Sequence, residues 1–173
     1  IQIIALAQNA GPAAARNAGS SAASGRYLWF LDSDDFLLPQ AWPRLLALMQ
    51  RYPEQDMYAF GYETTQGQAR KIVSKPPFRL RGEAGQILKA TAICVEIFAS
   101  MRFFPWNKII RRQIWLNHPF PEGRLFEDIS VVSAASASCD SCAWSRSPLL
   151  HYFMRPDSTT GSMSAQACHD LFY

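Results

Sequence analysis

The chain has 173 residues, 49% of them hydrophobic and 18% charged, which is enough for one packed domain and excludes the disordered class. Its formal net charge of +3 is small and its basic residues are spread along the chain, so we expect no nucleic-acid partner. The four cysteines do not make a disulfide framework in a chain of this length, and the CxxC pair Cys139 and Cys142 has no second pair to complete a zinc site.

The first half of the chain alternates between predicted strands and helices. Residues 1–7 form an isoleucine-rich strand, and the alanine-rich segment Asn9–Ser24 forms a helix. The apolar run Tyr27–Leu31 is typical of a strand that is covered on both faces, and Pro39–Tyr52 carries a helical pattern. This order predicts an α/β layer in which residues 1–6 and 27–31 are adjacent parallel strands joined by a right-handed crossover helix.

The second half is less regular, but it contains no internal repeat or linker. We expect a hairpin, a helical stretch, a short extended segment, two more helices and a last strand, at residues 56–64 with 68–73, 82–99, 104–110, 111–117, 126–138 and 144–155. The chain starts inside a strand without methionine and ends on an apolar segment, Leu171–Tyr173, which suggests a piece of a longer protein. An uncovered sheet edge or an apolar patch near Ile1–Ala7 should follow, and a homodimer is one way to cover it.

Three carboxylates, Asp32, Asp34 and Asp35, follow the apolar run directly. One of them could cap the next helix, but capping needs only one such residue. A divalent cation explains the cluster better, because Mg²⁺ and Mn²⁺ take oxygen ligands from carboxylates and from substrate phosphates. In α/β sheets, moreover, ligands bind where the strands end.

A second acidic pair, Glu127–Asp128, opens the predicted helix at 126–138. Acidic residues in the first turn of a helix are favoured by the helix dipole, so the pair alone is explained without any site.

Several segments in order resemble the family 2 glycosyltransferases, which are inverting enzymes of the GT-A fold. "NAGPAAARNAGSSAASGRYLWFLDSDDFLLP" resembles the family's Ala-Arg-Asn-x-Gly helix, apolar strand and DxD. "FPWNKIIRR" is similar to its Trp-Asn-Lys segment, "FPEGRLFEDISVV" to its Glu-Gly and Glu-Asp, and "YFMRPDSTTGSMS" to its Tyr-x-x-Arg-x-x-Ser. The resemblance implies a single GT-A catalytic domain over 1–173 with a mainly parallel central sheet, incomplete at the N-terminus, where the family's first strands are absent, and cut short at the C-terminus.

The resemblance also implies a reaction. A sugar would pass from a nucleotide-diphospho-sugar, most simply a UDP-sugar, to a hydroxyl of a glycan or lipid-linked acceptor in cell-surface polysaccharide or glycolipid synthesis. Asp34 would be the direct ligand of Mn²⁺ or Mg²⁺, and Asp32 would face the sugar or ribose or reach the metal through water. Asp128 would be the general base, with Glu127 as fallback or positioning partner.

Further site residues follow from the same resemblance. Trp106 could stack on an acceptor sugar or fill the core. Lys108 could bind the donor, and Arg155 and Ser158, in a loop after the last strand, could clamp its diphosphate. We expect Arg16 to be structural, on the helix that flanks the sheet.

Two rival functions stay open. A dehalogenase-like phosphotransferase also places a DxD after a strand, but it needs a nucleophilic first Asp and a later acidic pair with a Lys. A catalytically inactive glycan-recognition or assembly module would keep the same fold. No apolar run approaches the ~20 residues that span a bilayer, and no signal peptide is visible, so we expect a cytoplasmic protein, with the full-length form associating peripherally with the membrane.

Overall fold

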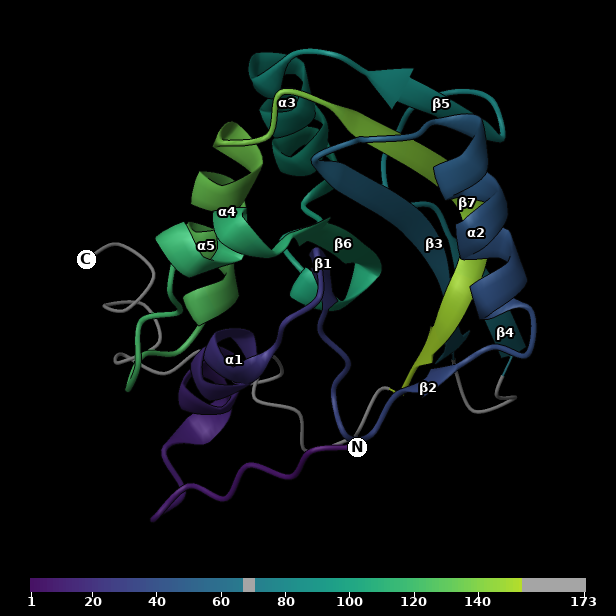
Figure 1. Ribbon diagram of the computed structural model, residues 1–173. Coiled ribbons are helices and arrows are strands. Elements are labelled where there is room, and N and C mark those ends of the chain that lie inside the picture. The colour runs from purple at the N-terminus through teal and green to yellow at the C-terminus, as the bar shows by residue number, and fades with distance from the viewer. Residues whose placement is uncertain (67–70, 154–173) are drawn as a thin grey trace.

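The computed structural model describes residues 1–66 and 71–153 of the chain. Helices and strands alternate irregularly along it, and Figure 1 shows how they surround one curled sheet. In chain order they are α1 (Gly11–Ala22), β1 (Tyr27–Trp29), β2 (Phe36–Leu37), α2 (Ala41–Arg51), β3 (Met57–Gln66), β4 (Lys71–Lys75), β5 (Ala84–Ile87), α3 (Ala90–Ser100), the 3-10 helix η1 (Pro105–Asn107), β6 (Lys108–Arg111), α4 (Arg112–Asn117), α5 (Glu127–Ala137) and β7 (Cys142–Tyr152).

The sheet is mixed. Its strand order is β1-β6-β3-β7-β2, with β4 paired to β3 and β5 paired to β7. Only β3 and β7 run parallel among the described pairs, while the other five pairs are antiparallel. The α/β class is thus confirmed, but the expected mainly parallel sheet is wrong, because hairpins and short returning strands, rather than repeated crossovers, supply most of the pairs.

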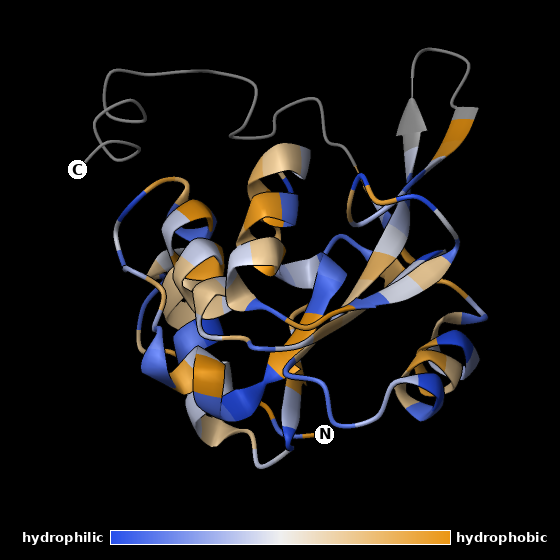
Figure 2. Ribbon diagram, turned by 90° about the horizontal axis from the view of Figure 1, so that it is seen from above, coloured by the Kyte–Doolittle hydropathy of each residue, from blue (hydrophilic) through white to orange (hydrophobic). Residues whose placement is uncertain are grey.

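Two apolar cores cover the two faces of the sheet. Side chains of β3 alternate between them, as they must in a strand: Met57 and Ala59 join one core, and Tyr58 and Phe60 join the other. Figure 2 shows α2 on one side of the apolar strands and the remaining helices on the other. This three-layer arrangement leaves the loops at the strand ends free to build a site.

Most predicted helices are confirmed. Helix α1 carries a proline in its first turn, as expected from Pro12, and α2 buries Ala41, Leu45 and Leu48 along one face. The helical stretch expected at 82–99 is wrong in its first part, since Ala84–Ile87 pairs with β7 as a strand before α3 begins.

The predicted first strand is wrong in this structure. Residues 1–6 form no strand, and β1 pairs with β6 in an antiparallel manner rather than with residues 1–6. A segment becomes a strand only where a neighbour shares its backbone hydrogen bonds, and no described strand lies beside residues 1–6. Its apolar side chains are exposed, Ile3 by 89%, so residues 1–6 form exposed apolar surface and not a sheet edge, and the edge strand at this end of the sheet is β1 instead.

The described residues also bear on the cysteines and on membrane insertion. Cys94, Cys139 and Cys142 are free thiols, the last two buried, as expected for the CxxC pair. Within the described ranges, no helix combines the length and the apolar character that crossing a membrane requires.

Candidate functional site

The carboxylates after β1 divide into two that face outward and one that faces inward. The backbone N–H of Asp35 donates to the carbonyl of Asp32 at 3.1 Å, which closes a tight turn. Asp32 and Asp34 remain partly exposed, whereas Asp35 is buried and accepts the backbone N–H of Phe153 at 2.9 Å. Asp35 therefore ties the turn to the end of β7 and does not cap α2, whose N-terminal cap position is Gln40.

The second acidic pair opens α5, as the sequence predicted. Glu127 and Asp128 occupy the first turn of the helix, where the dipole favours negative charge. The residue before them, Phe126, has φ of 58°, a left-handed conformation that costs a non-glycine residue about 1–3 kcal/mol. Such strain is typical of functional loops, and here it sets the direction in which the acidic pair enters the helix.

Arg16 joins the two acidic segments. Its Nη2 donates to Asp32 Oδ1 at 3.0 Å, and its Nη1 donates to Glu127 Oε1 at 2.6 Å. The Arg16 and Glu127 side chains are only 13% and 12% exposed, so this ion pair is shielded from solvent. The DSDD turn and the start of α5, which are distant in sequence, thus belong to one site.

Burial shapes the acid–base character of Asp128. Desolvation by burial and, to a smaller extent, the negative charge of Glu127 raise the pKa of this carboxyl, Arg16 and the backbone N–H groups at the helix start oppose the rise, and the net pKa is about 6. The carboxylate is therefore ionised at neutral pH and more basic than an exposed aspartate, as a general base should be. Burial has the largest effect on this pKa, larger than that of the backbone N–H groups at the helix start.

Tyr152 is a neighbour of the carboxylate turn that our sequence reasoning did not single out. Burial raises the pKa of its phenol, and the negative charges of Asp35, Asp34 and Asp32 add to the rise. Its ring stacks on Trp106 with centroids 5.0 Å apart. The signal was present in the sequence, because Tyr152 opens the segment "YFMRPDSTTGSMS" that we compared with the family's pattern.

Trp106 lies in the core rather than on an open surface. It is 3% exposed, stacks on Phe104 and Tyr152, and meets the edge of Tyr62. No ring face of Trp106 is open to a sugar in this conformation. The geometry favours the core interpretation, and the predicted acceptor contact has no support here.

Lys108 is also buried. Its ammonium donates to the carbonyls of Arg102 and Phe104 and to Oδ1 of Asn107, which uses all three of its N–H groups. Desolvation lowers its pKa to about 7. These contacts favour a structural role, in which Lys108 holds the 102–107 loop in place, over the predicted contact with the donor. The other two predicted donor contacts, Arg155 and Ser158, lie outside the described residues.

A divalent cation suits the carboxylate turn by its donor set. Among the described residues, no three His, Cys, Asp or Glu side chains gather into a metal-binding cluster. Mg²⁺ sites, however, often use only one or two protein carboxylates and take their other ligands from substrate phosphates and water. Asp32 and Asp34, both partly exposed, supply such a pair.

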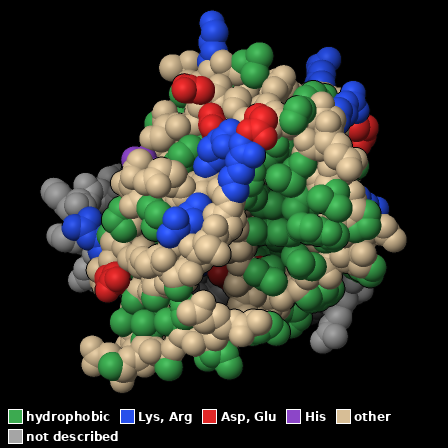
Figure 3. Space-filling model, in the orientation of Figure 1, with side chains coloured by type: hydrophobic (Ala, Val, Ile, Leu, Met, Phe, Trp, Pro, Cys, Tyr) green, Lys and Arg blue, Asp and Glu red, His purple; other side chains and the backbone are tan. Residues whose placement is uncertain are grey.

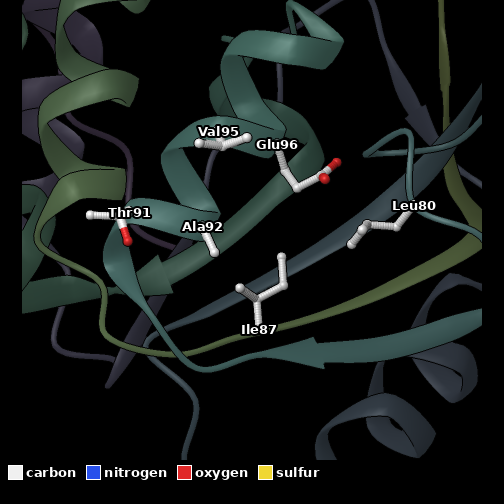
Figure 4. A pocket seen from close by; sticks show the side chains of 6 residues that line it. All are labelled: Leu80, Ile87, Thr91, Ala92, Val95 and Glu96. Atoms are coloured by element: carbon white, nitrogen blue, oxygen red, sulfur yellow. The ribbon is translucent and has the colours of Figure 1, made fainter.

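A separate apolar pocket of about 310 Å³ lies between α3, the end of β5 and the loop that precedes β5. Figure 4 shows its wall, where Ala92 and Glu96 of α3 face Ile87 and Leu80. Neither Arg16 nor any of the site carboxylates lines it, so the chemistry of the carboxylate site does not involve this pocket.

The fold matches solved structures of S. aureus TarS. The structure of TarS 1–349 in complex with UDP-GlcNAc superposes with a TM-score of 0.71 at 20% identity, covering 92% of this chain and 44% of that one. The complex with UDP gives a TM-score of 0.68 at 20% identity, covering 87% and 43%. At this identity the likeness shows the fold, and the domain has the α/β GT-A fold of nucleotide-diphospho-sugar transferases.

The sequence then places the chain in a family. Residues 1–110 match the family model of Glycosyl transferase family 2, and the chain belongs to that family. The "Succinoglycan biosynthesis protein ExoO" of Rhizobium meliloti (strain 1021) is 48% identical over 46 residues, which are 27% of this chain and 13% of that relative. The chain thus spans less than half the length of the relatives and structures that it matches.

Proposed function

We propose that this domain serves a glycosyltransferase that moves a sugar, with inversion, from a nucleotide-diphospho-sugar to an acceptor hydroxyl in polysaccharide or glycolipid synthesis. The observation that carries the proposal is the Arg16 bridge, which brings the DSDD turn and the Glu127–Asp128 pair into one site. A UDP-sugar is the donor we favour, because TarS, which has the same fold, binds UDP-GlcNAc and UDP. The relative named for succinoglycan biosynthesis supports a polysaccharide product.

The two acidic segments have different roles in this proposal. Asp32 and Asp34 hold the diphosphate side of the donor, together with Mn²⁺ or Mg²⁺. The cation, when bound, neutralises the charge of the leaving diphosphate as a Lewis acid. Asp128 accepts the proton of the acceptor hydroxyl while the acceptor oxygen bonds to the anomeric carbon, and the bonding electrons leave with the nucleoside diphosphate.

Inversion follows from a single displacement. The acceptor oxygen enters on the face of the sugar opposite the leaving diphosphate, so one base is sufficient and no covalent sugar–enzyme intermediate is needed. Asp128, with a pKa of about 6, suits the role of that base. Glu127 is ion-paired to Arg16, which makes it the positioning partner rather than the first choice for proton transfer.

The proposal also includes the contacts that the sequence predicted outside the described residues, and the acceptor. Arg155 and Ser158 are candidates for closing over the diphosphate, and the acceptor is a glycan or a lipid-linked sugar. A cytoplasmic location, with peripheral membrane association of the full-length protein, remains a prediction.

Binding of the donor tests the proposal. The full-length protein is screened for thermal shifts with a panel of nucleotide-diphospho-sugars, with Mn²⁺ or with a chelator. We expect a UDP-sugar to raise Tm only when Mn²⁺ is present, and Asp34→Asn to abolish the shift. Asp140→Asn, an exposed aspartate outside the site, is the matched control and should keep it. A full-length protein that no nucleotide-sugar stabilises, with or without Mn²⁺, would contradict the proposal.

A further inference from the structure

Helix α1 holds the segment that leads into α5 at several points. The side-chain amide of Asn17 donates to the carbonyl of Phe120 at 2.9 Å, and its Oδ1 accepts the backbone N–H of Phe120 at 2.8 Å. Asn17 also donates to Glu122 at 3.2 Å. Because both backbone groups of Phe120 are engaged, the start of the 120–126 segment cannot shift relative to α1 without losing two hydrogen bonds.

Arg16, which precedes Asn17 on α1, also contacts the 120–126 segment and the acidic residues. Its guanidinium lies 5.3 Å from the centroid of the Phe120 ring and ion-pairs with Asp32 and Glu127. A guanidinium is planar and presents its donors in a fixed fork, so two carboxylates bound to its two terminal nitrogens are held at a defined separation. Lysine, a single point charge on a flexible stem, cannot do this.

The ion pair between Arg16 and Glu127 is shielded from solvent, so we expect it to contribute to the stability of this part of the fold. Exposed ion pairs contribute little to stability, but Arg16 and Glu127 are each nearly nine-tenths buried. Removing Arg16 would leave Glu127 without its counter-charge beside Asp128, and the two segments would be free to separate.

We propose that Arg16 is a positioning residue that fixes the start of α5, and with it Asp128, relative to the donor-side carboxylate Asp32. This inference rests on the proposed function for its catalytic consequence, but the geometry that it describes can be tested separately. It also replaces our expectation that Arg16 only supports the packing of the helix.

The catalytic consequence is a loss of turnover with little loss of donor binding. A misplacement of about 1 Å between reacting groups can lower a rate by about 10²-fold. In the full-length enzyme we expect Arg16→Gln to lower kcat by about 10–10²-fold while the KM for the donor changes by less than about threefold. Arg16→Lys, which keeps the charge but not the fork, should recover only part of kcat.

The matched control is Arg112→Gln. Arg112 also bonds to α1, through the carbonyls of Ser20 and Ser21, but it contacts neither acidic segment in the described residues. It should lower stability slightly and leave both kcat and KM near their wild-type values. An Arg16→Gln enzyme with unchanged kcat and a strongly raised donor KM would overturn the proposal, because Arg16 would then bind the donor instead.

Amide hydrogen exchange tests the same inference without activity. In Arg16→Gln and Arg16→Lys, the amides of residues 126–129 should exchange at least about tenfold faster than in the wild type, while Arg112→Gln leaves them unchanged. Unchanged exchange in both Arg16 variants would overturn the positioning role. A wild-type protein that transfers no sugar would contradict the proposed function alone, and the exchange measurement would still decide on Arg16.

Discussion

At the scale of single residues, the site combines two carboxylates whose surroundings differ. Asp34 lies partly exposed on the turn after β1, while desolvation and the neighbouring charge of Glu127 raise the pKa of Asp128. Exposure suits a group that meets a hydrated cation and phosphates, and burial suits a group that must accept a proton near neutral pH. Both residues are aspartates, so the different roles that we propose for them rest on their surroundings.

The raised pKa of Asp128 predicts a pH profile. A general base works only when it is ionised, so activity should be lost as the pH falls through its pKa of about 6. We expect kcat/KM of the full-length enzyme to be level between about pH 7 and 8 and to fall about tenfold per unit below about pH 6. Initial rates at saturating Mn²⁺ measure this, and a profile that stays level down to pH 4.5 would exclude Asp128 as the base.

A substitution of Lys108 can distinguish its structural role from the donor contact that the sequence predicted. Its ammonium satisfies three acceptors in the 102–107 loop, and replacing it would leave them buried and unpaired. Lys108→Met should therefore lower the free energy of unfolding by about 2–4 kcal/mol, measured by urea denaturation. If stability is retained while donor affinity falls, the contact with the donor that we first predicted from the sequence is the correct role.

At the scale of elements, the sequence predicts helices better than strands. The helix patterns at α1, α2, α4 and α5 were recognisable because capping prolines and apolar spacing are local features. The strand at Ala84–Ile87 was not, since Ile87 is the only one of its four residues that favours strands, and the pairing with β7 decides its conformation. Residues 1–6 are the opposite case. Their composition favours a strand, but no described strand pairs with them.

Trp106 tests the packing between elements. It joins η1 to β3 and β7 through the rings of Phe104, Tyr62 and Tyr152. Trp106→Ala should lower the free energy of unfolding by about 3–5 kcal/mol, as expected for a buried aromatic residue, whereas Trp42→Ala on the exposed side of α2 should cost much less. Equal and small losses for both variants would instead favour the acceptor-binding role for Trp106.

At the scale of the whole molecule, the sequence predicted candidate site residues but not how they meet. The acidic motifs were found because their spacing resembles a family pattern, and the fold then confirmed the α/β class. The Arg16 bridge could not be read from the sequence, because an arginine on an alanine-rich helix is equally compatible with a solvated face. Only the folded chain shows that Arg16 of α1 contacts both acidic segments.

The molecule also exposes several large apolar side chains. Leu31, Phe36 and Leu37, after the edge strand β1, and Trp42 on α2 are each more than 40% exposed. Figure 3 shows a broad apolar area on this face of the molecule. Free edges and apolar patches of this kind favour association.

We therefore expect the chain of residues 1–173 to self-associate as its concentration rises, which sedimentation velocity would detect. Ile3→Lys, at the exposed N-terminal segment, should weaken the association, because a charge there interrupts the exposed apolar surface. Phe98→Lys, on the exposed side of α3, is the matched control and should not. A chain that remains monomeric at every concentration would contradict this expectation.

The central claim is that one site holds the donor through Asp34 and activates the acceptor through Asp128. The most direct measurement compares Asp34→Asn and Asp128→Asn in the full-length enzyme, with Asp140→Asn as the control, and determines donor affinity, Mn²⁺ affinity and kcat for each. We predict that Asp34→Asn loses metal-dependent donor binding and turnover together. Asp128→Asn should instead keep both affinities while kcat falls by about 10²–10⁴-fold. Turnover that survives in Asp128→Asn at the wild-type rate, or donor binding that is unaffected in Asp34→Asn, would contradict the account.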